Sequence, residues 1–406
     1  MDIRITPKTL SGTVTPPPSK SQAHRLLIAA ALGSGDSTLS GLADSQDIQA
    51  TRRCLCALGV RIDDLSPGTV QVHGLGNAAV EAGPAPILDC GESGSTLRFL
   101  IPLALLVNGS ACFTGHGRLM ERPMAPYEDL FREKGIFFEK KDGVLTVRGQ
   151  LTPGEYRLPG NVSSQFFTGL LFALPLLDGD STLVPTTPLE SRDYLEMTRS
   201  VLELAGVESR WEGDVLRIPG RQRCAPFEAT VEADWSQAAF WYAAIALGSQ
   251  LELEGLNAFS VQSDMAVVPH FLRLTHPGDL IIDLANIPDL LPPLAVMAAV
   301  RSGTTRFVNA ARLRMKESDR LSTVCAMLTA LGGRCQEGPD SLTVTGGTLT
   351  GGTVDSAGDH RIAMAAAIAA TGCSGPVTVL GAECVKKSYP DFWEVYKSLG
   401  GEVHVL

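Results

Sequence analysis

A supersecondary unit recurs along this 406-residue chain, and the recurrence restricts the possible fold more than any other feature of the sequence. Four times an apolar helical pattern ending in Gly is followed by a strand, a polar turn and a second strand, as in VLELAGVESRWEGD before VLRIPG, and VYKSLGGEVHVL at the C-terminus matches the first part of a fifth copy. The Gly is typical of a helix C-cap, and the polar turn is typical of a hairpin. Such self-similarity indicates a fold built from copies of one unit.

Six apolar helical segments that begin at a polar cap alternate with these hairpins. Their caps fall near residues 20, 95, 163, 235, 289 and 360. Most intervals are about seventy residues, so we predict roughly six βαβαββ units in an α/β fold. Each helix is apolar nearly all round and should be buried. A helix N-terminus attracts anions, although a capped core helix without a ligand explains any single one equally well.

Length and composition indicate a soluble protein of two domains, since one ordinary core does not organise so long a chain. The net charge of −10 argues against nucleic-acid binding, which needs a basic excess. The apolar run from Phe99 to Val107 is too short to span a bilayer, and the start MDIRITPKTL lacks the apolar core of a signal peptide. We therefore expect a cytoplasmic protein without a membrane segment.

No cofactor or metal site is expected. The nine cysteines form no CxxC or Cys/His ligand spacing, and they are interpreted as reduced, mostly buried residues. GESGSTLR lacks the Gly-Lys-Ser/Thr ending of a P-loop, and no Rossmann glycine pattern follows a strand. These absences disfavour a nucleotide-driven kinase.

Eight of the 34 Lys and Arg residues share a loop or helix-start setting beside Gly, Ser or Pro. They are Lys20, Arg25, Arg98, Arg122, Lys316, Arg320, Arg361 and Lys387. Opposite charges about 4 Å apart interact by roughly 4 kcal/mol at an effective dielectric near 20, so several cations together can hold two phosphorylated acids. Surface ion pairing explains any one of them alone, but not their common setting.

The chain resembles the 5-enolpyruvylshikimate-3-phosphate synthases, because eight segments match signature segments of that family and occur in the same order. They are PPPSKSQAHR, SGSTLR, ERPM, SSQ, IPDLLPPLAV, KESDRL, GDHRIAM and KKSYPDF. The resemblance implies an inverted α/β barrel of two domains with three βαβαββ repeats each. Residues 16–231 would form one domain, and residues 1–15 plus 232–406 the other. The active site would lie in the cleft between them, where closure excludes water.

The resemblance also assigns site residues, with no cofactor and a monomeric protein. The shikimate 3-phosphate site would comprise Lys20, Ser21, Arg25, Ser163, Ser164, Gln165, Ser191, Asp289 and Lys316. The phosphoenolpyruvate site would comprise Lys20, Gly94, Arg98, Arg122, Gln165, Arg320, Arg361 and Lys387. The catalytic residues would be Asp289, which matches the proton acceptor of the family, with Glu317 and Lys20. Asp289 could instead be a helix N-cap, and Glu317 an exposed helix residue paired with an Arg.

Two departures from the family pattern and two rival functions complete the predictions. The common Asn-Ala-Gly-Thr reads Glu92-Ser93-Gly94-Ser95, and Arg312 stands where well-known members have Asn. The first rival is the sister enzyme that transfers enolpyruvyl to UDP-N-acetylglucosamine. It has Lys-Asn where this chain has Lys20-Ser21, and it lacks the KESDRL pattern. The second rival is a non-catalytic binding relative on the same scaffold.

Overall fold

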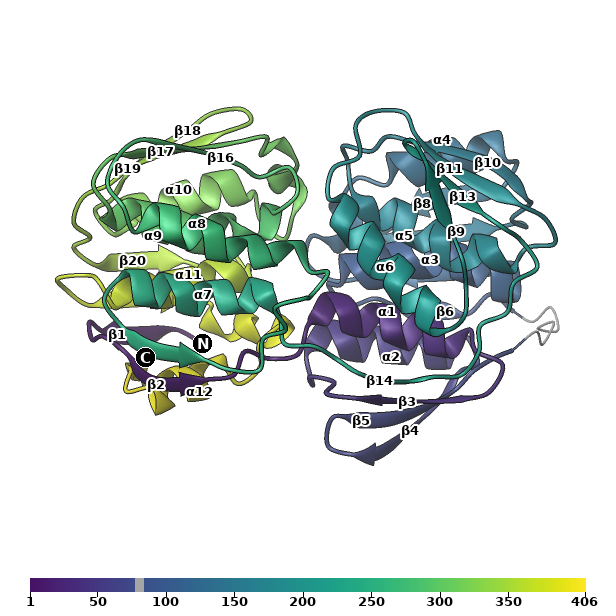
Figure 1. The fold of residues 1–406 in the computed structure, drawn as a ribbon, viewed down its shortest axis with the longest axis horizontal. Coiled ribbons are helices and arrows are strands. Elements are labelled where there is room, and N and C mark those ends of the chain that lie inside the picture. The colour runs from purple at the N-terminus through teal and green to yellow at the C-terminus, as the bar shows by residue number, and fades with distance from the viewer. Residues whose placement is uncertain (77–83) are drawn as a thin grey trace. The chain divides into compact units, whose positions relative to one another are not determined.

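The computed structural model describes residues 1–76 and 84–406 and divides the chain into two compact units (Figure 1). Unit 1 consists of Met1–Pro17 together with Glu232–Leu406. Unit 2 is the continuous segment Pro18–Val231. Unit 1 is thus assembled from both ends of the chain.

Unit 2 contains three four-stranded sheets with one topology: two parallel strands, followed by a hairpin antiparallel to the second. In sheet order the strands are β14 (Glu228–Thr230), β3 (Asp36–Ser40), β5 (Thr69–His73) and β4 (Arg61–Ser66); β6 (Ile87–Asp89), β7 (Ser110–Thr114), β9 (Val144–Arg148) and β8 (Phe137–Lys141); and β10 (Gly154–Leu158), β11 (Ser181–Pro185), β13 (Val215–Ile218) and β12 (Arg210–Glu212). The sheet that contains β3, β4 and β5 packs against α1 and α2 (Figure 1).

Two helices per repeat complete unit 2. They are α1 (Lys20–Ala31), α2 (Gln46–Ala57), α3 (Gly94–Asn108), α4 (Ala125–Glu133), α5 (Ser164–Ala173) and α6 (Arg192–Leu204), with 3-10 turns at Leu119–Glu121 and Leu174–Leu176. The predicted apolar helices α1, α3 and α5 are buried along most of their length, as expected. On α2, Cys54 is buried and Cys56 exposed, which fits their opposite directions on one helix.

Unit 1 repeats the same topology, with one shorter sheet. Its strands in sheet order are β16 (Leu280–Asp283), β17 (Thr304–Val308), β19 (Leu342–Thr345) and β18 (Arg334–Glu337); β20 (Gly352–Asp355), β21 (Val377–Leu380), β1 (Ile3–Thr6) and β22 (Glu402–Val405); and β15 (Gln250–Leu253) with β2 (Ser11–Val14). Among residues 1–76 and 84–406, five of the six predicted units thus have four strands, and the sixth has two.

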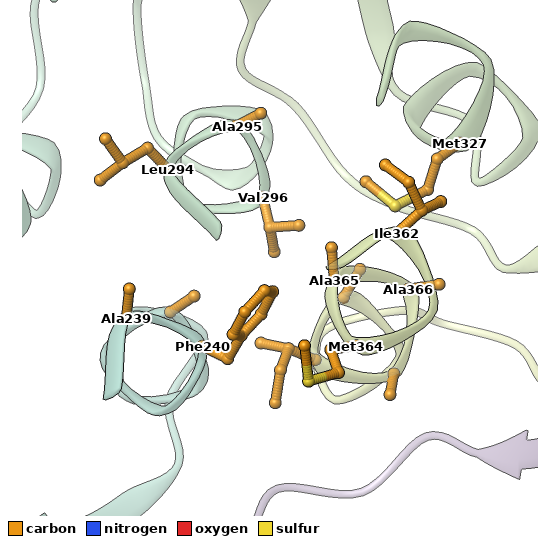
Figure 2. Packing of buried hydrophobic residues seen from close by; sticks show 14 of the residues in the cluster. Ala239, Phe240, Leu294, Ala295, Val296, Met327, Ile362, Met364, Ala365 and Ala366 are labelled. Carbon is orange, nitrogen blue, oxygen red and sulfur yellow. The ribbon is translucent and has the colours of Figure 1, made fainter. Parts of the chain in front are cut away.

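The helices of unit 1 are α7 (Trp235–Ala246), α8 (Val267–Leu274), α9 (Leu291–Val300), α10 (Arg320–Ala330), α11 (His360–Ala370) and α12 (Phe392–Ser398), with 3-10 turns at Ser263–Ala266, Pro288–Leu290, Ala311–Met315 and Ala382–Lys387. Figure 2 shows Phe240 of α7 pointing between α9, which contributes Val296, and α11, which contributes Met364. All three side chains are fully buried. Close packing of this kind fixes the helix ends, and with them the polar residues placed there.

Five of the six predicted helix starts carry a side-chain cap. Ser19, Ser93, Ser163, Asp234 and Asp359 each accept a backbone N–H of the following turn. The sixth, α9, has Leu290 at its N-cap without such a bond, so the capping interpretation of Asp289 is wrong. Prolines in the first turn of α9 have no N–H to satisfy, and Asp289 instead lies in the preceding 3-10 turn.

Within residues 1–76 and 84–406, no helix has both the length and the apolar character needed to cross a membrane.

Candidate active site

In unit 1, the carboxylate of Asp289 is surrounded by three cations. Arg320 Nη1 donates to Asp289 Oδ1 at 2.7 Å, and Lys316 Nζ lies 3.4 Å from the same oxygen. Arg361 Nη2 lies 3.3 Å from Asp289 Oδ2. The Asp289 side chain is 20% exposed, so it lies near the surface of unit 1 while the three cations hold it in place. Because Asp289 does not cap a helix, its carboxylate oxygens interact with the side chains of these cations instead of with backbone N–H groups.

The electrostatics of Asp289 favour the ionised form. Burial raises the pKa of this carboxyl group, but Arg361, Lys316 and Arg320 outweigh that effect and hold its pKa well below the ordinary value. Lys316 is affected in the opposite sense: burial, together with the neighbouring Arg320 and Arg312, lowers the pKa of its ammonium although Asp289 opposes the change. The three cations therefore keep Asp289 ionised, and only in that form can the carboxylate accept a proton.

Arg320 connects three carboxylates in this cluster. Besides Asp289, its Nη2 donates to Glu317 Oε2 at 2.7 Å and its Nε to Asp359 Oδ2 at 2.8 Å. The Arg320 side chain is only 1% exposed. Burial lowers the pKa of this guanidinium, but the three carboxylates, Asp359 foremost, raise it above its ordinary value. Glu317 is 12% exposed and lies before α10, so the interpretation as an exposed helix residue is wrong, although its pairing with an Arg is present.

The remaining predicted cations of unit 1 lie in the same cluster. Arg361 Nη2 donates to Ser236 Oγ at 3.0 Å, and Ser236 donates to the α7 cap Asp234 at 2.6 Å. Lys387 Nζ lies 3.9 Å from Glu317 Oε1, with its side chain 3% exposed. The starts of α7 and α11 and the turn before α10 therefore meet around Asp289.

In unit 2, Gly94 lies against a second group of predicted residues. A Cβ atom at Gly94 would lie 2.8 Å from Arg122 Nη1 and 3.0 Å from Arg98 Nη1. Arg98 Nη1 donates to Gln165 Oε1 at 2.7 Å, and Gln165 Nε2 donates to Ser95 Oγ at 3.0 Å. Two nearly buried guanidinium groups thus converge at the N-terminus of α3. A helix start and two Arg side chains together provide a strong local positive potential, suited to a small anion.

Lys20, the first residue of α1, donates through Nζ to Asp47 Oδ2 at 2.8 Å. Asp47 lines a hollow of about 440 Å³ together with Glu92. Glu92 comes two residues before Gly94, so this hollow adjoins the start of α3.

Arg25 connects α1 to α6 and also bonds to Ser21 within α1. Arg25 Nε donates to Thr198 Oγ1 at 2.8 Å, and its other nitrogens donate to the carbonyls of Ser21 at 2.6 Å and Tyr194 at 3.0 Å. Burial lowers the pKa of this guanidinium to about 10. Ser191, at the start of α6, is buried and has a left-handed backbone with φ of 55°. Residues other than glycine rarely adopt this conformation, and those that do are often found at functional sites.

The other residues of interest occupy helix ends and turns. Ser163 caps α5 by accepting the N–H of Gln165 at 3.3 Å, and Ser164 is the first residue of that helix. Arg312 is buried in the 3-10 turn Ala311–Met315, where its Nη2 donates to the carbonyl of Ala285. It contributes to lowering the pKa of Lys316, so this departure from the family pattern lies at the Asp289 cluster.

A buried polar chain joins the three helices that carry Lys20, Asp47 and Gly94. Thr96 donates to Ser93 at 2.7 Å, so it accepts from Thr51 at 2.6 Å, and Thr51 in turn accepts from His24 Nδ1 at 2.7 Å. His24 is therefore the neutral Nδ1–H tautomer. Burial, with Lys20 and Arg25 adding to it, lowers the pKa of His24 to about 3.

This histidine predicts acid sensitivity. A lowered pKa means that the unfolded chain takes up a proton where the folded one does not, so stability is complete above pH 6.5 and falls as pH drops toward 3. The loss attributable to His24 is at most about 1.4 kcal/mol per pH unit. His24→Asn, which keeps a donor near Thr51 but cannot ionise, is expected to flatten the free energy of unfolding between pH 6.5 and 4. Parallel urea-unfolding profiles for the two proteins would contradict this assignment.

The sequence did not identify the two carboxylates that pair with predicted site cations, Asp359 with Arg320 and Asp47 with Lys20. The polar cap predicted near residue 360 is Asp359, but no sequence signal indicated that the same carboxylate also accepts a hydrogen bond from Arg320. Asp47 gave no signal beyond an acid in the first turn of α2. No cluster of His, Cys, Asp or Glu suited to a metal ion is present in the described portions of the chain.

Comparison with known proteins gives consistent matches over nearly the whole chain. The sequence profile of the family described as EPSP synthase (3-phosphoshikimate 1-carboxyvinyltransferase) matches residues 5–396. The 3-phosphoshikimate 1-carboxyvinyltransferase of Clostridium kluyveri is 44% identical, with 99% of this chain and 98% of the relative covered. That of Clostridium acetobutylicum is 41% identical at the same coverage. The solved EPSP synthase of Acinetobacter baumannii superimposes with a TM-score of 0.82 at 26% identity, over 100% of both chains.

Proposed function

The chain belongs to the EPSP synthase family, and on this premise we propose that its two polar clusters act together on phosphoenolpyruvate and shikimate 3-phosphate. The protein is a transferase, a 3-phosphoshikimate 1-carboxyvinyltransferase, and the UDP-N-acetylglucosamine enzyme is not favoured. It has the two-domain inverted α/β barrel fold of the family. The reaction moves the enolpyruvyl group to the 5-hydroxyl of shikimate 3-phosphate and releases phosphate.

The observation that carries the residue assignment is the Asp289 cluster. A carboxylate kept ionised by Arg361, Lys316 and Arg320 is a base that anionic substrates can approach, because the surrounding cations offset their charge. We assign Asp289 to remove the proton of the 5-hydroxyl as that oxygen bonds to carbon 2 of phosphoenolpyruvate.

The other catalytic assignments follow from the chemistry of the adduct. Carbon 3 gains a proton in the addition and loses one in the elimination, when the bond to phosphate breaks and the double bond re-forms. We assign Glu317, between Arg320 and Lys387, and Lys20 to the proton at carbon 3 and to the charge of the leaving phosphate. The hydroxyl proton leaves on the phosphate, so the step requires no cofactor.

The anion-binding roles divide between the two units. We assign phosphoenolpyruvate to Gly94, Arg98, Arg122 and Gln165 of unit 2, with Lys20, and to Arg320, Arg361 and Lys387 of unit 1. We assign shikimate 3-phosphate to Lys20, Ser21, Arg25, Ser163, Ser164, Gln165 and Ser191 of unit 2 and to Asp289 and Lys316 of unit 1. We further propose that the protein acts as a cytoplasmic monomer.

A phosphate-release assay tests the function. Phosphate should appear with phosphoenolpyruvate plus shikimate 3-phosphate, and not when UDP-N-acetylglucosamine replaces the second substrate. Release only with the UDP-sugar would establish the sister activity. Substrate binding without any release would establish a non-catalytic relative.

Replacing Gly94 with Ala is expected to weaken phosphoenolpyruvate binding. The new methyl group would lie 2.8 Å from Arg122 Nη1, so the guanidinium must move away from the start of α3. Because the clashing atom is the end of a flexible side chain, the protein should fold normally, while the displaced guanidinium should raise the KM for phosphoenolpyruvate about fivefold, equivalent to about 1 kcal/mol. Steady-state kinetics on both substrates measure it. Gly347→Ala, whose Cβ would meet its nearest neighbour at 3.5 Å, is the control, and an unchanged KM in Gly94→Ala would remove Gly94 from this site.

A further inference from the structure

The ion pair between Lys20 and Asp47 differs from an ordinary surface pair. Its two side chains are 17% and 6% exposed, and the Nζ–Oδ2 distance is 2.8 Å. Water therefore screens this ion pair less than an exposed one. The pair consequently restricts the position of the Lys20 ammonium more strongly. The partners begin two different helices, so the pair connects the starts of α1 and α2.

The helix that carries Asp47 is itself held at a second point. One turn further along each helix, His24 of α1 meets Thr51 of α2 at 2.7 Å, and Thr51 meets Thr96 of α3 at 2.6 Å. Lys20 with Asp47 and His24 with Thr51 therefore form two successive contacts at helical spacing. The second contact is fully buried and continues to the α3 start. Asp47 thus holds Lys20 from a helix fixed relative to Gly94.

The residues around Asp47 suggest why the Lys20 ammonium needs a fixed partner. The hollow that it lines also contains the acidic residues Asp44, Asp89 and Glu92, together with Arg53 and His116. A lysine side chain has four flexible bonds, and its ammonium can follow any nearby carboxylate. The 2.8 Å contact with Asp47 holds the Lys20 ammonium at one position.

We propose that Asp47 is a positioning residue for the transfer reaction: through the Lys20 ammonium it sets where positive charge meets phosphoenolpyruvate. The inference rests on the proposed function, which assigns Lys20 to this substrate. Because Asp47 acts through Lys20, the effect of replacing it on turnover should depend on the presence of Lys20. Misplacement of a reacting group by about 1 Å costs up to roughly a hundredfold in rate.

Steady-state kinetics of Asp47→Asn test the proposal. We expect kcat/KM for phosphoenolpyruvate to fall about 10- to 100-fold. Asp47→Glu, which restores the charge on a side chain one carbon longer, is expected to recover a part of that loss. Asp44→Asn is the matched control, since it removes one charge from the same hollow at an exposed residue, and it should keep wild-type kinetics. Equal losses in Asp44→Asn and Asp47→Asn would show a general charge effect and overturn the proposal.

A double-mutant cycle with Lys20→Ala separates this inference from the proposed function. If Asp47 acts through Lys20, Asp47→Asn should change kcat/KM less than twofold in the Lys20→Ala background. Additive losses would overturn the positioning role while leaving Lys20 in the mechanism. Wild-type turnover of Lys20→Ala alone would instead refute the proposed function of Lys20. Urea unfolding of each variant distinguishes a kinetic loss from a folding defect.

Discussion

Arg320→Met is expected to cost roughly 3–5 kcal/mol of unfolding free energy and to abolish phosphate release. Removing one partner of a buried ion pair leaves the other charge uncompensated, which is the origin of this magnitude. Here the guanidinium is 1% exposed, and the change would leave three carboxylates, Asp289, Glu317 and Asp359, without it. Urea unfolding measures the first effect and the phosphate assay the second.

Arg314→Met is the matched control for this change. Arg314 also bridges two carboxylates, Asp319 at 2.8 Å and Glu337 at 2.7 Å, but its side chain is 28% exposed. Pairs of this kind contribute about 0–1 kcal/mol because water screens them. A loss for Arg320→Met no larger than that for Arg314→Met would show that the buried network does not stabilise unit 1.

Asp289→Asn is expected to lower kcat by a factor of about 10² to 10⁴ while leaving the protein folded. The amide keeps the size of the side chain but cannot accept the hydroxyl proton, and general base catalysis contributes about this factor. The phosphate assay at saturating substrates measures kcat. The exposed neighbour Asp283, replaced by Asn, should retain normal turnover. A kcat for Asp289→Asn within a factor of two of wild type would remove Asp289 as the base.

The lowered pKa of Asp289 sets the pH range in which this base works. Because the pKa of Asp289 is lower in the folded protein than in the unfolded chain, its ionisation stabilises the fold at every pH above 3.8. That stabilisation is lost as the pH falls through the pKa of the folded state. At neutral pH the free enzyme therefore already contains the ionised base. The kcat/KM profile should show no acidic limb from Asp289 between pH 8 and 5.

Local signals in the sequence were sufficient for most of the scaffold. Ser19, Ser93 and Ser163 cap helices where a Ser before an apolar run predicted a start. The same rule failed at Asp289, because prolines in the first turn of α9 remove the N–H groups that a cap would serve.

Partners distant in sequence could not be predicted in the same way. Arg320 and Asp359 are 39 residues apart, and Lys20 and Asp47 are 27 apart. The sequence shows charged residues at loops, but whether a cation faces a ligand or a buried carboxylate depends on which loops the fold brings together. The residue assignments to each substrate therefore stay predictions, to be tested by the variants above.

The family resemblance placed residues 1–15 with residues 232–406, but it did not show which strands pair with one another. The sheet of β3, β4 and β5 is completed by β14, through the parallel pairing of Thr38 with Glu228. In unit 1, β1 lies between β21 and β22, with Ile3 opposite both Val379 and Val405. These strands are only three and four residues long, and their sequences do not specify which neighbouring strand each one pairs with.

The position of β1 has a consequence for biosynthesis. Unit 2 has all of its strands once Val231 has left the ribosome, whereas the central strand Ile3–Thr6 lacks one neighbour until Glu402 is made. At about 5–20 residues per second, translation from Val231 to Glu402 takes on the order of 10–30 s. Unit 2 can thus fold during translation, while an early-made segment with open hydrogen-bonding edges waits for its partners. Chaperone binding to the nascent chain would fall in this interval.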